Sequence, residues 1–287
     1  MTPEKVAQPA LRQVAALVRG QRTSDGAGVR LTRLLGHETV ESADPFLMLD
    51  HFDTEEASDY IGGFPDHPHR GFETVTYMLE GRMRHGDNAG HSGVIGTGDV
   101  QWMTAGRGIV HSEMPEQTEG LMRGFQLWVN LPKRDKMVPA RYQEIPAATI
   151  PVEARGNGTT VKVIAGTTSQ GTRGPIESGA TAAHFFDIRL AQGASIEEAL
   201  DPGLNALLVV YDGWVRIAGE KTVPAVNVAL LGPGERVAIA NAGDEAAGVL
   251  LIAGRPLNEP VAWGGPFVMN TRDEVLQAAR DYQAGRF

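Results

Sequence analysis

The chain has 287 residues, of which 42% are hydrophobic, 35 are glycine and none is cysteine. The absence of cysteine excludes disulfides, thiolate metal sites and cysteine nucleophiles, so any metal would need histidine and carboxylate ligands. The formal net charge of −9 opposes binding to nucleic acid or to an anionic membrane, because both are negatively charged.

The first 20 residues include an early proline and glutamate and no continuous apolar stretch, which is unlike a signal peptide. No apolar run approaches the roughly 18 residues that a membrane-spanning helix needs. The lack of cysteine also fits a reducing compartment. We therefore expect a cytoplasmic protein that makes no membrane contact.

Short apolar or alternating runs between glycine, proline, aspartate and asparagine predict strands along most of the chain. In chain order these runs are residues 74–79, 93–95, 99–103, 125–129, 161–164, 184–190, 207–211, 214–217, 226–231, 235–240 and 248–253. Only residues 271–285 resemble an amphipathic helix, with Thr271 as N-cap and Glu274 completing a capping box. The predicted fold class is all-β, with many short strands spaced as in sandwiches and barrels.

A weak internal repeat predicts two barrels. In the first half, TVTYMLEG at residues 74–81 is followed by GTGD at 96–99, and in the second half ALLVVYDG at 206–213 is followed by GPGE at 232–235. Chance similarity of turn sequences is the alternative explanation. With a Gly-, Ser- and Thr-rich crossover at residues 157–179, we expect an N-terminal domain over residues 1–150. A C-terminal domain would cover residues 151–287 and include the helix.

Two histidine-containing pairs carry the chemical signal. His67 and His69 are two residues apart, as are His111 and Glu113, and side chains at that spacing share one face of a strand. Two facing strands would therefore offer three imidazoles and one carboxylate, a donor set that suits Fe(II), Mn, Ni, Co, Cu or Zn. A single His-x-His pair would be weak evidence, but two such pairs favour a metal site. Glu73 competes with Glu113 as the carboxylate ligand.

Other polar and aromatic residues receive structural interpretations. His85 and His91 are expected in hydrogen-bonded turns. Asp66 and Arg70 flank the first pair and could supply hydrogen bonds to its imidazoles, as metal sites usually require. Candidates for an apolar wall are Phe46, Phe72, Trp102 and Met103.

Two long strings resemble the pirin family of the cupin superfamily: GFPDHPHRGFETVTYMLEG at residues 63–81 and GDVQWMTAGRGIVHSEMP at 98–115. Shorter runs at residues 44–50, 126–131 and 265–271 support the resemblance. It implies two cupin (jelly-roll β-barrel) domains arranged face to face, with one metal ion, most often Fe(II), in the first. The family's metal ligands correspond to His67, His69, His111 and Glu113, and Glu73 corresponds to a residue that is not a ligand.

The second half departs from the pattern of a metal-binding cupin. Aligning Gly213 with Gly81, and Gly234 with Gly98, leaves no histidine at any ligand position. The residues at those positions are Ala199, Asp201, Asn205, Ala247 and Val249. We therefore expect the C-terminal barrel to be free of metal and to support the first barrel.

The resemblance implies a metal-dependent dioxygenase that opens a flavonol (quercetin-like) ring with O₂, a quercetin 2,3-dioxygenase-type oxidoreductase. Its substrate would be a small aromatic or enolic molecule, and Glu113 would accept the substrate hydroxyl proton. The alternative is an iron-binding, redox-responsive regulatory protein that acts through a protein partner. Because two barrels can cover each other's sheets within one chain, we expect a monomer without direct nucleic-acid contact.

Overall fold

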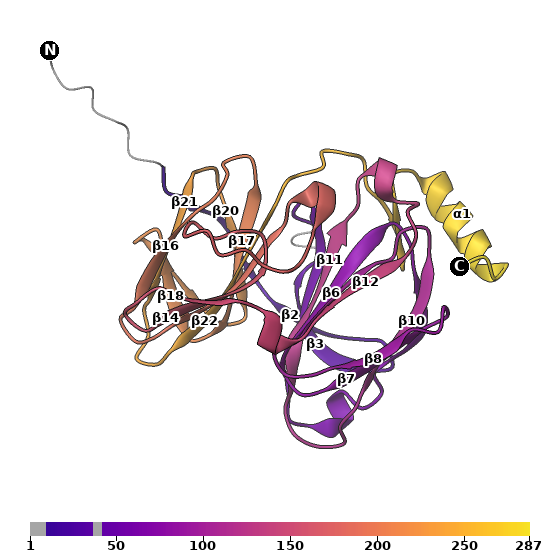
Figure 1. Ribbon diagram of the computed structural model, residues 1–287, viewed down its shortest axis with the longest axis horizontal. Coiled ribbons are helices and arrows are strands. Elements are labelled where there is room, and N and C mark those ends of the chain that lie inside the picture. Colours follow the sequence, from indigo (N-terminus) through magenta and orange to yellow (C-terminus); the bar gives the residue numbers. More distant parts are fainter. Residues whose placement is uncertain (1–9, 37–41) are drawn as a thin grey trace, which may run out of the picture. The chain divides into compact units, whose positions relative to one another are not determined.

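The computed structural model describes residues 10–36 and 42–287, which form two compact, strand-rich units (Figure 1). The N-terminal barrel unit consists of Gly20–Ile150, Pro175–Ala182 and Arg255–Phe287. The C-terminal barrel unit consists of Pro151–Gly174, Ala183–Gly254 and the described part of Met1–Arg19. Among the described residues, no helix is long and apolar enough to cross a bilayer.

The N-terminal barrel unit contains a seven-stranded sheet in the order β12-β9-β6-β11-β4-β3-β2 and a four-stranded sheet in the order β5-β10-β7-β8. All of these strand pairs are antiparallel, and a β23-β24 hairpin, four short 3₁₀ helices and α1 accompany them. The elements are β2 (Gln21–Asp25), β3 (Val29–Leu35), β4 (Phe46–Thr54), η1 (Ala57–Asp59), β5 (Phe64–His69), β6 (Phe72–Glu80), β7 (Met83–Asp87), β8 (Ser92–Ile95), β9 (Val100–Thr104), β10 (Ile109–Pro115), β11 (Met122–Asn130), η2 (Lys133–Asp135), β12 (Arg141–Ile145), η3 (Ala147–Thr149), η4 (Gly179–Thr181), β23 (Ala262–Gly264), β24 (Phe267–Met269) and α1 (Arg272–Gln283).

The C-terminal barrel unit repeats this plan, with a seven-stranded sheet in the order β1-β20-β17-β22-β15-β14-β13 and a four-stranded sheet in the order β16-β21-β18-β19. The matching sheet sizes agree with the internal repeat seen in the sequence. The strands are β1 (Val14–Arg19), β13 (Val152–Ala154), β14 (Thr159–Ala165), β15 (His184–Leu190), β16 (Ser195–Ala199), β17 (Asn205–Asp212), β18 (Trp214–Ile217), β19 (Lys221–Pro224), β20 (Asn227–Leu231), β21 (Arg236–Asn241) and β22 (Ala247–Gly254).

The two units interleave along the chain, unlike the expected single division after residue 150. Strand β1 belongs to the C-terminal barrel unit because it pairs along β20, from Val14 opposite Leu231 to Arg19 opposite Asn227. This pairing satisfies main-chain groups that β20 would otherwise leave open at the sheet edge. Residues 255–287, including α1, belong instead to the N-terminal barrel unit. Each barrel is therefore built from both halves of the sequence.

Helix α1 begins where the sequence predicts. The Thr271 hydroxyl accepts a hydrogen bond from the Glu274 amide at 3.2 Å, and a Glu274 carboxylate oxygen accepts one from the Thr271 amide at 2.9 Å. These two bonds form the predicted capping box. Ala278 is the buried residue of the helix, whereas Leu276 is 48% exposed. The helix consequently packs on its unit through a narrow contact.

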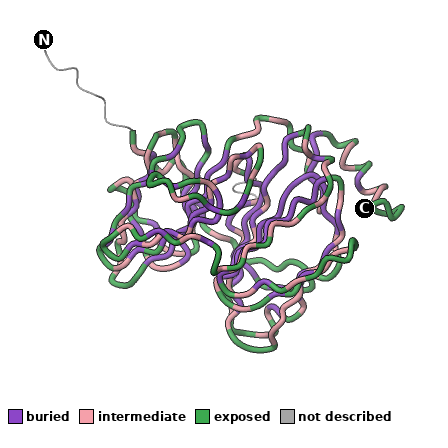
Figure 2. The backbone as a smooth tube through the Cα atoms, in the orientation of Figure 1, coloured by how far each residue is buried: buried purple, intermediate pink, exposed green. Residues whose placement is uncertain are grey.

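The barrel interiors differ in chemistry, although buried strands run through both units (Figure 2). The hydrophobic core cluster of the C-terminal barrel unit consists of aliphatic side chains and Phe186, and this unit also buries charged side chains such as Asp187 and Glu198. The buried histidines of the described residues all lie in the N-terminal barrel unit: His51, His69, His85 and His111. Burying polar groups is unfavourable unless they find partners, so this concentration of buried imidazoles indicates a candidate site in the N-terminal barrel unit.

Candidate metal centre

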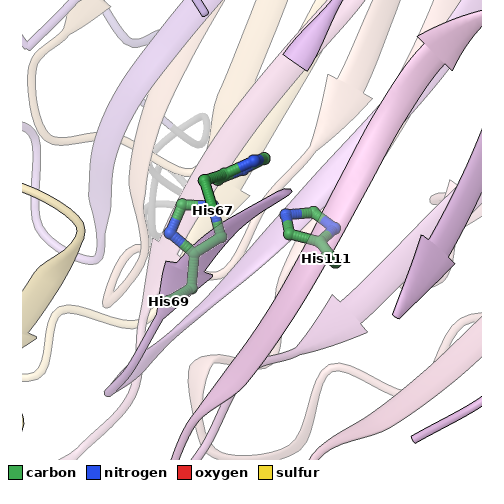
Figure 3. Close-up of side chains that lie close together, drawn as sticks. All are labelled: His67, His69 and His111. Carbon is green, nitrogen blue, oxygen red and sulfur yellow. The ribbon is translucent and has the colours of Figure 1, made fainter. Parts of the chain in front are cut away.

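Strands β5 and β10 bring the predicted histidines together. His67 and His69 are two residues apart on β5, so their side chains share one face of the strand. His111 lies on the neighbouring antiparallel strand β10, directly opposite His67. Figure 3 shows the three imidazoles converging from these two strands. Their ligand nitrogens all lie within 4.8 Å of one another. Among the described residues, these three histidines are the group of potential ligand side chains that lie close enough together to hold one metal ion.

The hydrogen bonding of the imidazoles leaves nitrogens available for a cation. His67 Nδ1 lies 2.8 Å from the carbonyl oxygen of Pro65, so a proton on Nδ1 would leave Nε2 free as a ligand. His111 is only 1% exposed, yet neither of its ring nitrogens has a hydrogen-bond partner. Buried polar atoms are normally paired, so these unpartnered nitrogens fit a site that a metal ion completes.

The electrostatics favour neutral imidazoles, which are the form that binds metals. Burial, followed by the nearby His67, lowers the pKa of His69 to about 3. Burial also holds the pKa of His111 well below its ordinary value, and His69 and His67 add to this effect. A protonated imidazole has no lone pair to donate. Both side chains are therefore ready to act as ligands at neutral pH.

Glu113 lies in the same interior but outside the group of three histidines. The pairing of β10 with β5 shifts between His111 and Glu113, so that Glu113 lies opposite Phe64. Its Oε1 is 2.9 Å from the Thr76 hydroxyl and its Oε2 is 3.4 Å from the Gln126 amide nitrogen. Burial raises the pKa of Glu113. The carboxylate is thus held by residues of β6 and β11, beside the imidazoles.

A cavity of about 420 Å³ opens onto His67 and His69, and its walls differ in character. His67, His69, Glu113 and Gln126 line one part of it. An aromatic wall is provided by Phe52, Phe64, Trp128 and Trp263. Within that wall, the Trp128 and Trp263 rings are stacked with centroids 5.6 Å apart and an interplanar angle of 26°.

A polar group on the cavity wall consists of Asp25, Arg33 and Asp50. Arg33 donates to both Asp50 oxygens, at 2.9 and 2.7 Å, and to Asp25 at 2.9 Å. The hydrogen bond to Asp50 is the largest influence on Arg33 and raises its pKa, so the guanidinium remains charged. Arg33 therefore links the two carboxyl groups, whose oxygens make this wall rich in hydrogen-bond acceptors.

The candidate site neighbours separate into residues at the histidine cavity and residues outside it. Glu73 is buried and its Oε1 accepts from the Thr104 hydroxyl at 2.7 Å, but it lies outside the histidine group and lines a separate cavity. Phe46, Trp102 and Met103 are buried but do not line the histidine cavity. Phe72 does contact the site, because its ring lies 5.0 Å from that of His69.

The residues flanking the first histidine pair have other roles than expected. Arg70 forms an ion pair with Asp281 at 2.7 Å instead of serving an imidazole. Asp66 lines a separate surface cavity. His91 does occupy a turn, where its Nδ1 lies 2.9 Å from Asp87. His85 is instead a buried residue of β7 opposite Glu113, with its Nε2 2.7 Å from Glu144.

Sequence reasoning did not identify Thr76, Gln126 or Trp263 as parts of the site. Thr76 and Gln126 are register partners on β6 and β11, so only the pairing of these strands reveals their shared contact with Glu113. Trp263 lies on β23, far along the chain from the other lining residues. The GPFVMNT run at residues 265–271, which resembles the pirin family, was the nearest available signal.

Comparisons with known proteins agree with this architecture. The family model described as Pirin matches residues 28–129, and that of the Pirin C-terminal cupin domain matches residues 185–287. A pirin-like protein from Caulobacter vibrioides is 60% identical over 96% of this chain and 99% of its own length. Human pirin is 40% identical over 95% of this chain and 92% of its own.

A solved structure gives the same result. The crystal structure of quercetin 2,3-dioxygenase from Acinetobacter baumannii matches with a TM-score of 0.88 and 34% identity, covering 97% of this chain and 99% of that one. The expected fold class is confirmed: the chain is mostly strands, with two cupin domains and one short C-terminal helix. The chain belongs to the pirin family.

Proposed function

We propose that the protein is a metal-dependent dioxygenase that opens the ring of a flavonol such as quercetin with O₂. The observation that carries this proposal is the group of three imidazoles, with unpartnered buried nitrogens on His69 and His111, two of which (His67 and His69) line a cavity with an aromatic wall. The similarity to a solved quercetin 2,3-dioxygenase supports the same reaction class.

His67, His69 and His111 would hold one divalent ion, for which Fe(II) is our first choice among Fe, Mn, Ni, Co, Cu and Zn. Neutral nitrogen ligands suit all of these ions, so the donor set does not select one. When bound, the ion supplies a Lewis acid and electron-transfer centre for the substrate and O₂. Glu113 is the proposed fourth ligand, and Thr76 and Gln126 would hold its carboxylate beside the histidines.

Glu113 would also accept the proton of the substrate hydroxyl. Among the described residues, its Oε2 accepts a hydrogen bond from the Gln126 side chain at 3.4 Å, whereas its Oε1 has the closer 2.9 Å contact with Thr76. Oε2 is therefore the oxygen with more capacity to take a proton. A general base within hydrogen-bond reach typically contributes about 10²–10⁴-fold to the rate.

The cavity walls suit a flat polyphenol. The stacked Trp128 and Trp263 rings offer a planar apolar surface, on which an aromatic ring can pack. The Asp25 and Asp50 carboxylates offer acceptors for phenolic hydroxyl groups. Enclosure between these walls would place the enolic part of the substrate toward the histidines and keep bulk water away from it.

The test combines metal analysis with aerobic turnover. Purified protein is analysed for metal and mixed with quercetin in air, while the flavonol absorbance and CO release are followed. We expect turnover that chelation or His69→Ala abolishes, and that the exposed His91→Ala control retains. Full metal occupancy without loss of any flavonol would overturn the enzymatic proposal and favour the iron-binding regulatory protein. Unchanged metal content in a His67→Ala, His111→Ala double variant would overturn the ligand assignment.

A further inference from the structure

Asp281 and Phe287 contact residues that immediately adjoin the two strands carrying the candidate metal ligands. Arg70 follows His69 at the end of β5, and its side chain is nearly buried. Its guanidinium pairs with Asp281 of α1 at 2.7 Å. The same guanidinium lies 4.4 Å from the centre of the Phe287 ring. The end of β5 is therefore attached to a segment about 200 residues away in the sequence.

Phe287 also contacts the start of β10, the strand of His111. Gly108 immediately precedes β10, and a Cβ atom added to it would lie 2.9 Å from the Phe287 ring, so the ring packs directly on this backbone. The Asn88 side chain donates to the main-chain oxygen of Phe287 at 2.9 Å. Asn88 in turn exchanges hydrogen bonds with the Val110 backbone. One aromatic residue thus connects the ends of both ligand-bearing strands.

The backbone around Arg70 is fixed by the same C-terminal part of the unit. The Arg70 amide donates to the Pro266 carbonyl at 3.4 Å, and the Val268 amide donates to the Arg70 carbonyl at 3.0 Å. Gly71, with φ +91°, approaches the Val268 carbonyl so closely that a Cβ atom would lie 2.0 Å from that oxygen. These main-chain contacts share the positioning of the end of β5, and hence of His69, with the contacts of the Arg70 side chain.

We propose that Asp281 and Phe287 form a latch that positions the metal centre, so that docking of the latch and binding of metal are thermodynamically coupled. This inference depends on the metal site of the proposed function. Ala278 is the buried residue of α1, and few buried apolar contacts are a feature of elements that open locally, so we expect the helix to undock more easily than the strands. Undocking would leave the buried Arg70 guanidinium without its carboxylate partner, which is unfavourable. The end of β5 would then shift and spread the three imidazoles.

Coupling of this kind is reciprocal, so two measurements follow from it. The first is the affinity for Co(II), read from its visible absorption and from competition with a chromogenic chelator. Asp281→Asn and Phe287→Leu should each weaken Co(II) binding by about 10-fold. Leu276→Ala, an exposed change on the same helix without contact to Arg70, should leave the affinity unchanged.

The second measurement needs no variant. Co(II) should slow amide hydrogen exchange in residues 272–287 of the wild-type protein by a factor similar to the loss of affinity in the latch variants. The latch proposal is wrong if Co(II) binds the wild type without slowing this exchange and binds the Asp281→Asn and Phe287→Leu variants with undiminished affinity. If the wild type does not bind Co(II) in the histidine site, the proposed metal centre itself fails, which is a separate outcome.

Discussion

His67 and His111 face each other across an antiparallel strand pair, with their ring centroids 4.4 Å apart. His69 lies 4.6 Å from His67 by the same measure, so the three rings surround one small volume. Neighbouring imidazoles at this distance would repel each other if protonated. The arrangement therefore suits a site that a single cation completes.

Replacing Glu113 with glutamine separates its two proposed roles. Glu113→Gln keeps the size of the side chain but removes the proton acceptor, while the three imidazoles remain. We expect metal content to be retained and quercetin turnover to fall by about 10²–10⁴-fold. Metal analysis and turnover on the same sample check this. Glu73→Gln, a change to another buried carboxylate outside the histidine group, is the control, and undiminished turnover in Glu113→Gln would contradict the proposed role.

Thr76 is expected to act by positioning Glu113. Thr76→Val removes the hydroxyl 2.9 Å from Oε1, and a hydrogen bond to a charged group contributes about 1.5–3 kcal/mol. We expect kcat to fall by about 10- to 100-fold with little change in KM, and Thr76→Ser to restore it. Thr104→Val removes a comparable hydroxyl from Glu73 and should leave kcat unchanged. Equal kcat losses in both valine variants would indicate a general structural effect.

Trp263 should contribute to substrate binding more than to chemistry. Trp263→Ala removes a ring on which the aromatic substrate would pack, and an aromatic pair contributes about 0.5–1.5 kcal/mol. We therefore expect KM for quercetin to rise by about 3- to 10-fold, with kcat nearly constant. Trp214→Ala is a matched control, because Trp214 is similarly exposed but does not line the cavity. A KM that responds equally to both changes would exclude a specific role for Trp263.

Lys136 should make the free energy of unfolding depend on pH in the alkaline range. Its buried ammonium donates to the carbonyls of Gly71 and Val268 and to the Asn130 side chain, at 2.6–2.9 Å. Burial lowers its pKa from 10.5 to about 8. Between these values the unfolded chain keeps the proton that the folded protein has released. The contribution of Lys136 to stability therefore rises as pH increases from about 8 to 10.5 and is constant below that window.

The measurement compares urea unfolding of the wild type and Lys136→Met at pH 7, 8, 9 and 10. The free energy of unfolding of the wild type should increase relative to the variant across the alkaline window, by up to about 3 kcal/mol. Using the difference between the two proteins cancels the titration of groups that they share. A difference that stays flat with pH would show that the folded protein does not depress the pKa of this lysine.

The histidine pairs were predictable because the period of a strand is local. Spacing alone places His67 and His69 on one face, and the antiparallel pairing of β5 with β10 then brings His111 opposite them. The position of Glu113 was harder to predict from the sequence. The pairing of β10 with β5 shifts in register after His111, so the two-residue spacing no longer gives the residue of β5 opposite Glu113. A bulge of this kind depends on tertiary packing and has no clear local signal here.

The partners of Arg70 and Glu113 show what sequence patterns leave out. Arg70 was expected to serve a neighbouring imidazole, yet its carboxylate partner, Asp281, is 211 residues away. Thr76 and Gln126 meet only because their strands are paired in one register. Contacts of this type are fixed by the fold as a whole. The family resemblance anticipated the fold and the histidines, but not these supporting contacts.

The interleaving of the two barrel units has a consequence for synthesis of the protein. Arg70 leaves the ribosome long before Asp281, and 211 residues at roughly 5–20 residues per second correspond to on the order of 10–40 s. Strand β1 is likewise synthesised before β20, the strand with which it pairs. Neither barrel can close its last contacts during translation of its own half of the chain. A nascent chain halted after residue 150 should therefore hold the three histidines without the segments that complete their surroundings.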